Sequence, residues 1–481
     1  MPYKLPTVTA YTRKGKALVI ALRMLLRAVH WTHGRRWQTP PQYFHDDPRH
    51  YTKKDLLFFA YKYYFKSPVK DDADGAVVEF FKKYPPTFSK PDDFKEISSI
   101  KLTAAGDLMP YEWIQSDFCT HLWDDIGDDF FDADIRFANL ETPIDTSKPA
   151  SLVPEVMLND MHFNGDEAMF DIFNPLTHTP LGNESSGQYK ISDSEKLNKN
   201  WKFDILSTAN NHSLDMGEEG LKNTIAFLYQ KKILHTGTSR SEKERLDFPV
   251  FEHKGIRIAF LSYTFSMNQL TNPSEKSYLV NHLEVNQPDI DLMPLKKDIF
   301  YAKTVRKADF VVLSLHYGNA YQAYPGAHVV ANTQRIFTEC GPDVILGGHA
   351  HNIQPMAAYP FDCPLTGEAK RGFVIFSFGD FVAYDIFNWC HLSVYLKLTI
   401  SKGIDFNNNT IKTILTDVKP TPVYACGVYK NKESRDLRFL NAEKTEQKLR
   451  IAEKPAFMTD WNVRELKGLM VFYRDYFAKN L

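Results

Sequence analysis

Between residues 98 and 400, short apolar runs alternate with stretches of helical periodicity. Six runs have the composition of buried strands: SIKLTAAG (99–106), DILSTA (204–209), IRIAFLSYT (256–264), ADFVVLSLH (308–316), DVILGG (343–348) and FVIFSF (373–378). Helical patterns such as GEEGLKNTIAFLYQKK (217–232) lie between them. Strands that alternate with helices predict an α/β domain, which we place at residues 98–400.

The sequence on either side of this domain has a different pattern. Residues 1–97 contain three segments of helical spacing and predict a helical N-terminal extension, which the proline-rich PPTFSKPDD (85–93) closes. Residues 401–481 predict a C-terminal strand and helix tail, with the helix in FMTDWNVRELKGLMVFYRDYF (457–477). A polar stretch with GNESSG (182–187) predicts a surface insertion within residues 145–200.

The apolar run ALVIALRMLLRAV (17–29) is too short to cross a membrane. As a helix it spans about 20 Å, against the ~30 Å of a hydrocarbon core, and two arginines interrupt it. Lys16, Arg23, Arg27 and His30 fall on one helical face. Two interpretations stay open: a helix packed on its own protein, or an interfacial helix that contacts anionic lipid through residues 16–30.

Charge and cysteine usage exclude some classes of protein. The net charge is −1, so we expect no nucleic-acid partner. The five cysteines are scattered, odd in number and without a CxxC pair, which favours buried free thiols over disulfides or a thiolate zinc site. No export signal is recognised, so we expect a cytoplasmic or membrane-peripheral location.

Side chains that can bind a metal follow almost every predicted strand. They are Asp107, Glu141, Asn211, His316, His349 and His351. Taken singly, each has an ordinary explanation as a turn, cap or core residue. Taken together they predict a metal site, because ligands of α/β sheets bind outside the carboxyl ends of the strands. Carboxylate, amide and imidazole donors suit Mn, Fe(II) or Zn.

The order of these residues resembles the calcineurin-like metallophosphoesterase plan. The motifs AAGDLM, FANLETPI, STANNHSLDMGEEGL, SLHYG and GPDVILGGHAHNIQP resemble, more closely, the CapA family, which is associated with bacterial poly-γ-glutamate capsule synthesis. This resemblance covers residues 99–385. It implies an α/β fold with a metallophosphatase-like two-sheet β-sandwich flanked by helices.

The resemblance also implies a role for each site residue. Glu141 would bridge two metals, with Asp107 and His351 on one metal and Asn211, His316 and His349 on the other. His212 would face the scissile group as an acid or charge stabiliser, and Asp215 would orient it. One or two divalent ions (Mn, Fe or Zn) would make hydroxide available by lowering the pKa of bound water.

The chain departs from the family pattern at three positions. Met109 replaces the histidine expected two residues after Asp107, Ala320 replaces a glutamate, and Asp380 replaces an asparagine. Met109 leaves the first metal with only Asp107, Glu141 and His351 as predicted protein ligands.

We therefore expect a CapA-like metal-dependent hydrolase of capsule or cell-envelope polymers. Metal-activated water would attack a phosphoester or a γ-glutamyl amide, and capsule-synthesis proteins would be its partners. The alternative is a non-catalytic component of a capsule synthase complex that binds an anionic polymer.

Overall fold

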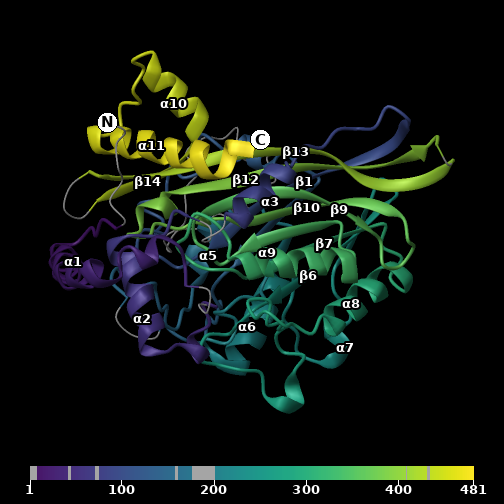
Figure 1. Cartoon of the computed structure of the whole chain (residues 1–481), viewed down its shortest axis with the longest axis horizontal. Coiled ribbons are helices and arrows are strands. Elements are labelled where there is room, and N and C mark those ends of the chain that lie inside the picture. The colour runs from purple at the N-terminus through teal and green to yellow at the C-terminus, as the bar shows by residue number, and fades with distance from the viewer. Residues whose placement is uncertain are drawn as a thin grey trace, which may run out of the picture.

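The computed structural model describes residues 8–41, 45–70, 75–157, 161–175, 201–407, 409–430 and 434–480. Two mixed β-sheets are flanked by helices (Figure 1). This arrangement confirms the predicted α/β class and is that of a metallophosphatase-like fold. The GNESSG stretch, which we predicted to be a surface insertion, lies outside the described residues.

The first sheet has the strand order β14-β13-β12-β1-β2-β3-β4, with β11 paired to β1. Strands β1 to β4 run parallel, and β12, β13 and β14 are antiparallel. The bounds are β1 Phe94–Leu108, β2 Ile135–Leu140, β3 Ile205–Ser207, β4 Leu234–Thr236, β11 Asp380–Val382, β12 Leu392–Asp405, β13 Thr410–Tyr429 and β14 Arg435–Asn441. The last two strands come from the predicted C-terminal tail and extend this sheet.

The second sheet has the order β5-β6-β7-β8-β10-β9. Its four central strands run parallel, and β5 and β9 are antiparallel edges. The bounds are β5 Val250–His253, β6 Ile256–Thr264, β7 Phe310–His316, β8 Val344–Gly348, β9 Ile353–Asp362 and β10 Ala369–Phe378.

The main core lies between the two sheets. Phe137 of β2 stacks on Phe260 of β6 with ring centroids 5.9 Å apart, and the hydroxyls of Ser207 and Ser262 are within hydrogen-bond distance across the sheets. Every residue of β3, β7 and β8 is buried. Because central parallel strands have both faces covered, they are apolar without alternation, which is the pattern that predicted them.

Helices cover the sheets and the sheet ends. Their bounds are α4 Gly127–Phe131, α5 Glu167–Phe173, α6 Gly217–Gln230, α7 Glu242–Arg245, α8 Met293–Thr304, α9 Ala327–Arg335, α10 Ala442–Arg450 and α11 Asp460–Phe472. Helix α11 occupies the predicted C-terminal helix and continues as the π-helical turn η8 (Tyr473–Phe477). Its buried Glu465 accepts hydrogen bonds from Tyr424 of β13 and lies 2.9 Å from His391, so the tail is joined to the first sheet.

The N-terminal extension is helical, and it packs against the α/β domain. It contains α1 (Arg13–His33), α2 (Lys53–Ala60), the π-helical turn η3 (Tyr61–Phe65) and α3 (Ala76–Lys83). Helices α1 and α2 gather at one end of the sandwich (Figure 1). Phe81 of α3 packs edge-on against Phe376 of β10, and the Tyr63 hydroxyl donates to Asp385.

Helix α1 is attached to the protein along one side only. Arg23 donates to the carbonyls of Tyr64 and Val8, and His30 bonds the Tyr61 hydroxyl. The predicted basic face is therefore split, because two of its four members are used for internal contacts. The outward side exposes four large apolar residues: Ile20, Met24, Leu25 and Trp31. Within the described residues, no helix combines the length and apolarity needed to cross a membrane.

All five cysteines are buried and free, as the sequence predicts.

Candidate metal centre

The carboxyl ends of five parallel strands from both sheets meet at one place. Asp107 lies near the end of β1, Glu141 directly follows β2, and Asn211 lies beyond β3. From the second sheet, His316 ends β7, and His349 and His351 follow β8. Parallel strands bring their carboxyl ends to a common edge, so residues far apart in sequence converge there.

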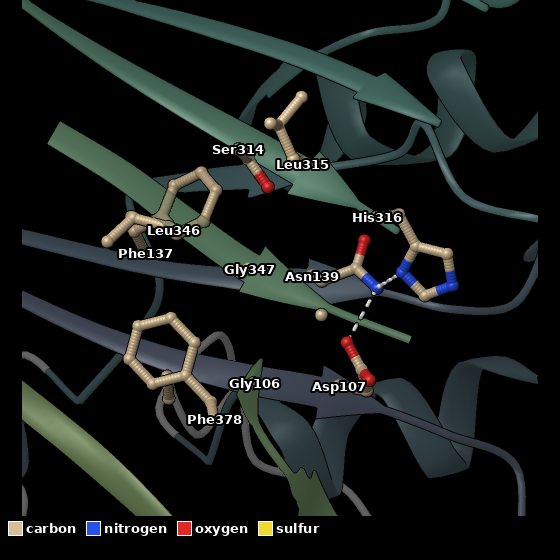
Figure 2. A pocket seen from close by; sticks show the side chains of 12 residues that line it. Gly106, Asp107, Phe137, Asn139, Ser314, Leu315, His316, Leu346, Gly347 and Phe378 are labelled. Carbon is tan, nitrogen blue, oxygen red and sulfur yellow. Dashed lines mark hydrogen bonds between the residues drawn. The ribbon is translucent and has the colours of Figure 1, made fainter. Parts of the chain in front are cut away.

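Asp107, Glu141 and His316 form a first group of ligands. One donor atom from each lies within 4.8 Å of the others, and all three side chains are buried. His316 Nε2 is 3.4 Å from Glu141 Oε1. Asn139 donates from Nδ2 to Asp107 Oδ1 at 2.8 Å and lies 3.4 Å from His316 Nδ1; Figure 2 shows these three side chains pointing toward one another.

Asn211 joins this first group through its amide oxygen. Its Oδ1 lies 2.8 Å from His316 Nε2, and its Nδ2 donates to Asn268 Oδ1 at 3.1 Å. The bond to Asn268 turns the amide nitrogen away from the site. The oxygen of Asn211 and the carboxylate of Glu141 therefore both face the same nitrogen of His316.

A second group consists of Asp107, His351 and Asp380. Strand β11 pairs with β1 so that Asp380 is the register partner of Asp107. Asp380 Oδ1 lies 2.9 Å from His351 Nδ1, and the ring of Tyr321 stacks on His351 with a centroid distance of 5.2 Å. Met109, at the position where the family pattern expects a ligand, is buried in an apolar cluster.

His349 is in a different environment from the other predicted ligands. It lies against Asp46 of the N-terminal extension, with His349 Nε2 3.5 Å from Asp46 Oδ2. Both histidines of the GGHAH motif have left-handed backbones, with φ of 83° at His349 and 59° at His351. Such conformations are costly for non-glycine residues and occur mainly at functional sites.

His212 lies beside the centre and is held by two neighbours. Its Nδ1 is 2.6 Å from Asp215 Oδ2, and its ring stacks on Phe163 with centroids 4.0 Å apart. Asp215 also accepts a hydrogen bond from the backbone N–H of Phe163. A carboxylate on one imidazole nitrogen leaves the other nitrogen available for proton transfer.

Burial and mutual repulsion disfavour negative charge on two of the carboxyl groups. Burial raises the pKa of Asp107 to about 7, and Glu141 adds to the shift. Burial likewise raises the pKa of Asp380 to about 7, against the opposing effect of His351. These carboxyls are fully ionised at neutral pH only when a further positive charge is present.

The histidines of the centre fall into two classes. Burial lowers the pKa of His316 to about 3 and that of His349 to about 4, so both are neutral and can act as ligands. Burial also disfavours charge on His351, but Asp380 and Glu141 outweigh it and raise the pKa of His351 to about 10. At neutral pH His351 therefore carries a proton and a positive charge beside Asp380.

The unpartnered polar atoms of this centre fit a divalent cation. Both oxygens of Glu141, Oδ2 of Asp107, Oδ2 of Asp380 and both ring nitrogens of His349 are buried without a hydrogen-bond partner in the described residues. Buried polar atoms are nearly always bonded, so a cluster of such atoms implies an absent ligand. Gly348 keeps the space open, since a Cβ there would lie 3.0 Å from Asp107 Oδ1 and 3.3 Å from His316 Nδ1.

Four residues at the centre were not among the predicted ligands. Asp46, Asn139, Asn210 and Asp380 contact predicted ligands or each other. Asn139 and Asp380 follow the same strand-end pattern as the predicted ligands. That pattern points to Asn139 from the sequence alone, and it could have identified Asp380 as well. Asp46 lies in a segment without any such pattern.

Comparison with known proteins gives a match to one family. Residues 192–385 match the family described as bacterial capsule synthesis protein PGA_cap. The chain is 29% identical over 184 residues to the capsule biosynthesis protein CapA of Bacillus anthracis, which is 37% of this chain and 40% of that protein. It is 27% identical over 219 residues to the PGA biosynthesis protein CapA of Bacillus subtilis (strain 168), 44% of this chain and 51% of that protein.

The matched region therefore spans about half or less of the length of these relatives. The family-matched residues 192–385 include Asn211, His316, His349 and His351, and they end just beyond Asp380. The family match and the two CapA proteins together show that this part of the chain is similar to the CapA family of bacterial capsule synthesis proteins.

Proposed function

We propose that this chain is a metal-dependent hydrolase of capsule or cell-envelope polymers, with poly-γ-glutamate or a phosphoester as its substrate. The observation that carries the proposal is the environment of the Glu141 side chain. This carboxylate is fully buried, and neither of its oxygens has a hydrogen-bond partner in the described residues. Burying a carboxylate without hydrogen-bond partners is costly, and a bound cation would offset that cost.

The distances support one assignment of the residues that would hold the cation. Asp107 belongs to both groups, so it would contribute to both sides, with Glu141, His316 and Asn211 on one side and His351 and Asp380 on the other. This oxygen and imidazole donor set suits Mn, Fe(II) or Zn. When bound, such a cation supplies Lewis acidity, which lowers the pKa of water and polarises the oxygen of a phosphoryl or acyl group.

His212 is the residue that we assign to proton transfer. Asp215 and Phe163 fix its ring, and neither contact uses Nε2. A histidine held in this way can donate a proton to a leaving group or stabilise charge that develops on it.

Metal analysis and turnover of one set of variants test the hydrolase. Protein purified without added metal is analysed for bound metal, then assayed with a nitrophenyl phosphoester and with poly-γ-glutamate. We expect Glu141→Gln to lose both metal and turnover. Glu465→Gln is the matched control, because Glu465 of α11 is equally buried but bonds Tyr424 and His391, neither of which is a proposed ligand.

The same experiment separates the alternative function. Binding of poly-γ-glutamate that is independent of metal and without turnover would instead support a non-catalytic component of a synthase complex. Turnover that requires Glu141 and His316 would exclude that alternative.

We also propose that helix α1 contacts an anionic membrane surface. The helix contains no Asp or Glu, and its outward side combines exposed Arg13, Lys14, Lys16 and Arg27 with four exposed apolar side chains, of which Trp31 is 82% exposed. Basic helices with exposed aromatic and aliphatic residues bind at lipid interfaces, and each cation near an anionic surface contributes about 1 kcal/mol.

Vesicle flotation of the full chain tests this contact. We expect binding to vesicles that contain phosphatidylserine, weakened by salt and by Met24→Ser combined with Trp31→Ser. Ile451→Ser is the control, because Ile451 is also exposed but lies beyond the end of α10. Equal binding of all variants, or binding to neutral vesicles alone, would contradict the assignment.

A further inference from the structure

Asp46 brings a buried carboxylate from the N-terminal extension to the metal centre. It precedes the family-matched residues 192–385 and every motif on which the resemblance rests. Its side chain is 1% exposed, and Asp46 Oδ2 lies 3.5 Å from His349 Nε2. The backbone of Asp46 is left-handed, with φ of 58°, a conformation that asparagine and aspartate tolerate better than most residues.

Three other groups hold this carboxylate in place. The Tyr51 hydroxyl donates to Oδ1 at 2.6 Å, the backbone N–H of Ala320 donates to Oδ2, and Lys62 Nζ lies 3.5 Å from Oδ2. Two of these groups belong to the N-terminal extension, and Ala320 belongs to the segment that follows β7. The carboxylate is therefore fixed from both sides of the boundary between the extension and the α/β domain.

The ion pair of Asp46 with Lys62 is not explained by stability alone. Both side chains are buried, and Lys62 has no exposed surface. Buried ion pairs contribute little net stability, since desolvation of the two charges cancels most of their attraction. The pair is better explained by its effect on geometry, because Lys62 holds the Asp46 carboxylate beside His349.

The contact with His349 assigns different roles to the two ring nitrogens. His349 Nε2 lies 3.5 Å from Asp46 Oδ2, whereas Nδ1 points away from this carboxylate, and neither buried nitrogen has a hydrogen-bond partner in the described residues. Histidines that bind metals usually donate their other N–H to a carboxylate, which fixes the tautomer and the ring orientation. His351 is arranged in a similar way, with Asp380 against one ring nitrogen at 2.9 Å.

We propose that Asp46 is the positioning residue for His349. Its carboxylate faces Nε2 of His349 at 3.5 Å and so leaves Nδ1 for the cation. The N-terminal extension is then a structural part of the metal centre. Ala320 is consistent with this role: the side chain at 320 offers no carboxylate, and the carboxylate of Asp46 lies against the N–H of that residue. This inference rests on the proposed metal site.

Titration of metal-stripped full-length protein with Mn²⁺ tests the proposal. Asp46→Asn keeps the shape of the side chain but removes its charge, and Asp46→Asn with Lys62→Met removes the two charges together so that the fold is preserved. We expect both to bind Mn²⁺ about 10–100-fold more weakly than the native chain, the usual effect of losing such a carboxylate. Thermal unfolding of the metal-free proteins identifies variants that are folded like the native chain.

Asp47→Asn is the matched control. Asp47 is adjacent, is 3% exposed and bonds Arg49 and Ser266, and within the described residues it makes no hydrogen bond or ion pair with a histidine of the centre. We expect this variant to bind Mn²⁺ within about threefold of the native chain. Native affinity in a folded double variant would overturn the role of Asp46. Failure of the native chain itself to bind Mn²⁺ would instead overturn the metal site.

Discussion

Metal affinity should fall steeply as the pH is lowered from 8 to 6. The cause is the raised pKa of Asp107 and Asp380, about 7 for each. Because the folded-state pKa is raised, the protonated carboxyl is favoured below pH 7 and the carboxylate above it. A cation that binds at pH 6 must therefore displace protons that are absent at pH 8.

The size of the effect follows from these two groups. A carboxyl with a pKa of 7 is about 90% protonated at pH 6 and about 90% ionised at pH 8, which weakens apparent affinity by about a factor of 10 per group. Adjacent carboxyls titrate as a pair, so we expect about 10–100-fold from these two groups. The ligand nitrogen of His351, whose pKa is raised to about 10, must also lose a proton, which adds about a factor of 10 per pH unit and makes the total loss larger.

Isothermal titration calorimetry with Mn²⁺ at pH 6, 7 and 8 measures this effect. Two buffers with different ionisation enthalpies at each pH give the number of protons released. At pH 6, we expect the Asp380→Asn variant to release about one proton fewer than the native chain when Mn²⁺ binds. Equal affinity at pH 6 and 8, without proton release, would refute the reasoning, since the carboxyls would then be ionised before the cation arrives.

Three further predictions concern the centre and the extension. Gly348→Ala should weaken metal binding in a folded protein, measured by the same calorimetry, because the new methyl would lie 3.0 Å from Asp107 Oδ1; native affinity would show that this space is not used. Asn211→Ala should lower bound metal measured by elemental analysis, whereas His212→Ala should keep the metal and lower turnover by about 10²–10⁴-fold; equal metal loss in both would contradict the two roles. Deletion of residues 1–35 should preserve the metal, since Asp46 and all proposed ligands remain, but should reduce flotation with anionic vesicles; loss of metal from the folded truncated protein would show that α1 also supports the centre.

Local sequence patterns predicted the fold class and most of the strands. Strands such as β7 and β8 are buried on both faces, so their apolar composition is visible without knowledge of any neighbour. The residue that ends or follows a parallel strand lies at the ligand-binding edge, which is why Asp107, Glu141 and His316 could be selected from sequence. Their convergence in one group is a consequence of strand order.

Only the tertiary structure decided which residues complete the centre and where the flanking segments lie. Asp380 contacts His351 because β11 pairs with β1, and Asp46 reaches His349 because the extension folds back over the domain. The strands of the C-terminal tail, β13 and β14, extend the first sheet beyond β12. Such contacts join residues that are distant in the chain. Their positions are set by packing and pairing between elements, and no local periodicity or composition records that information.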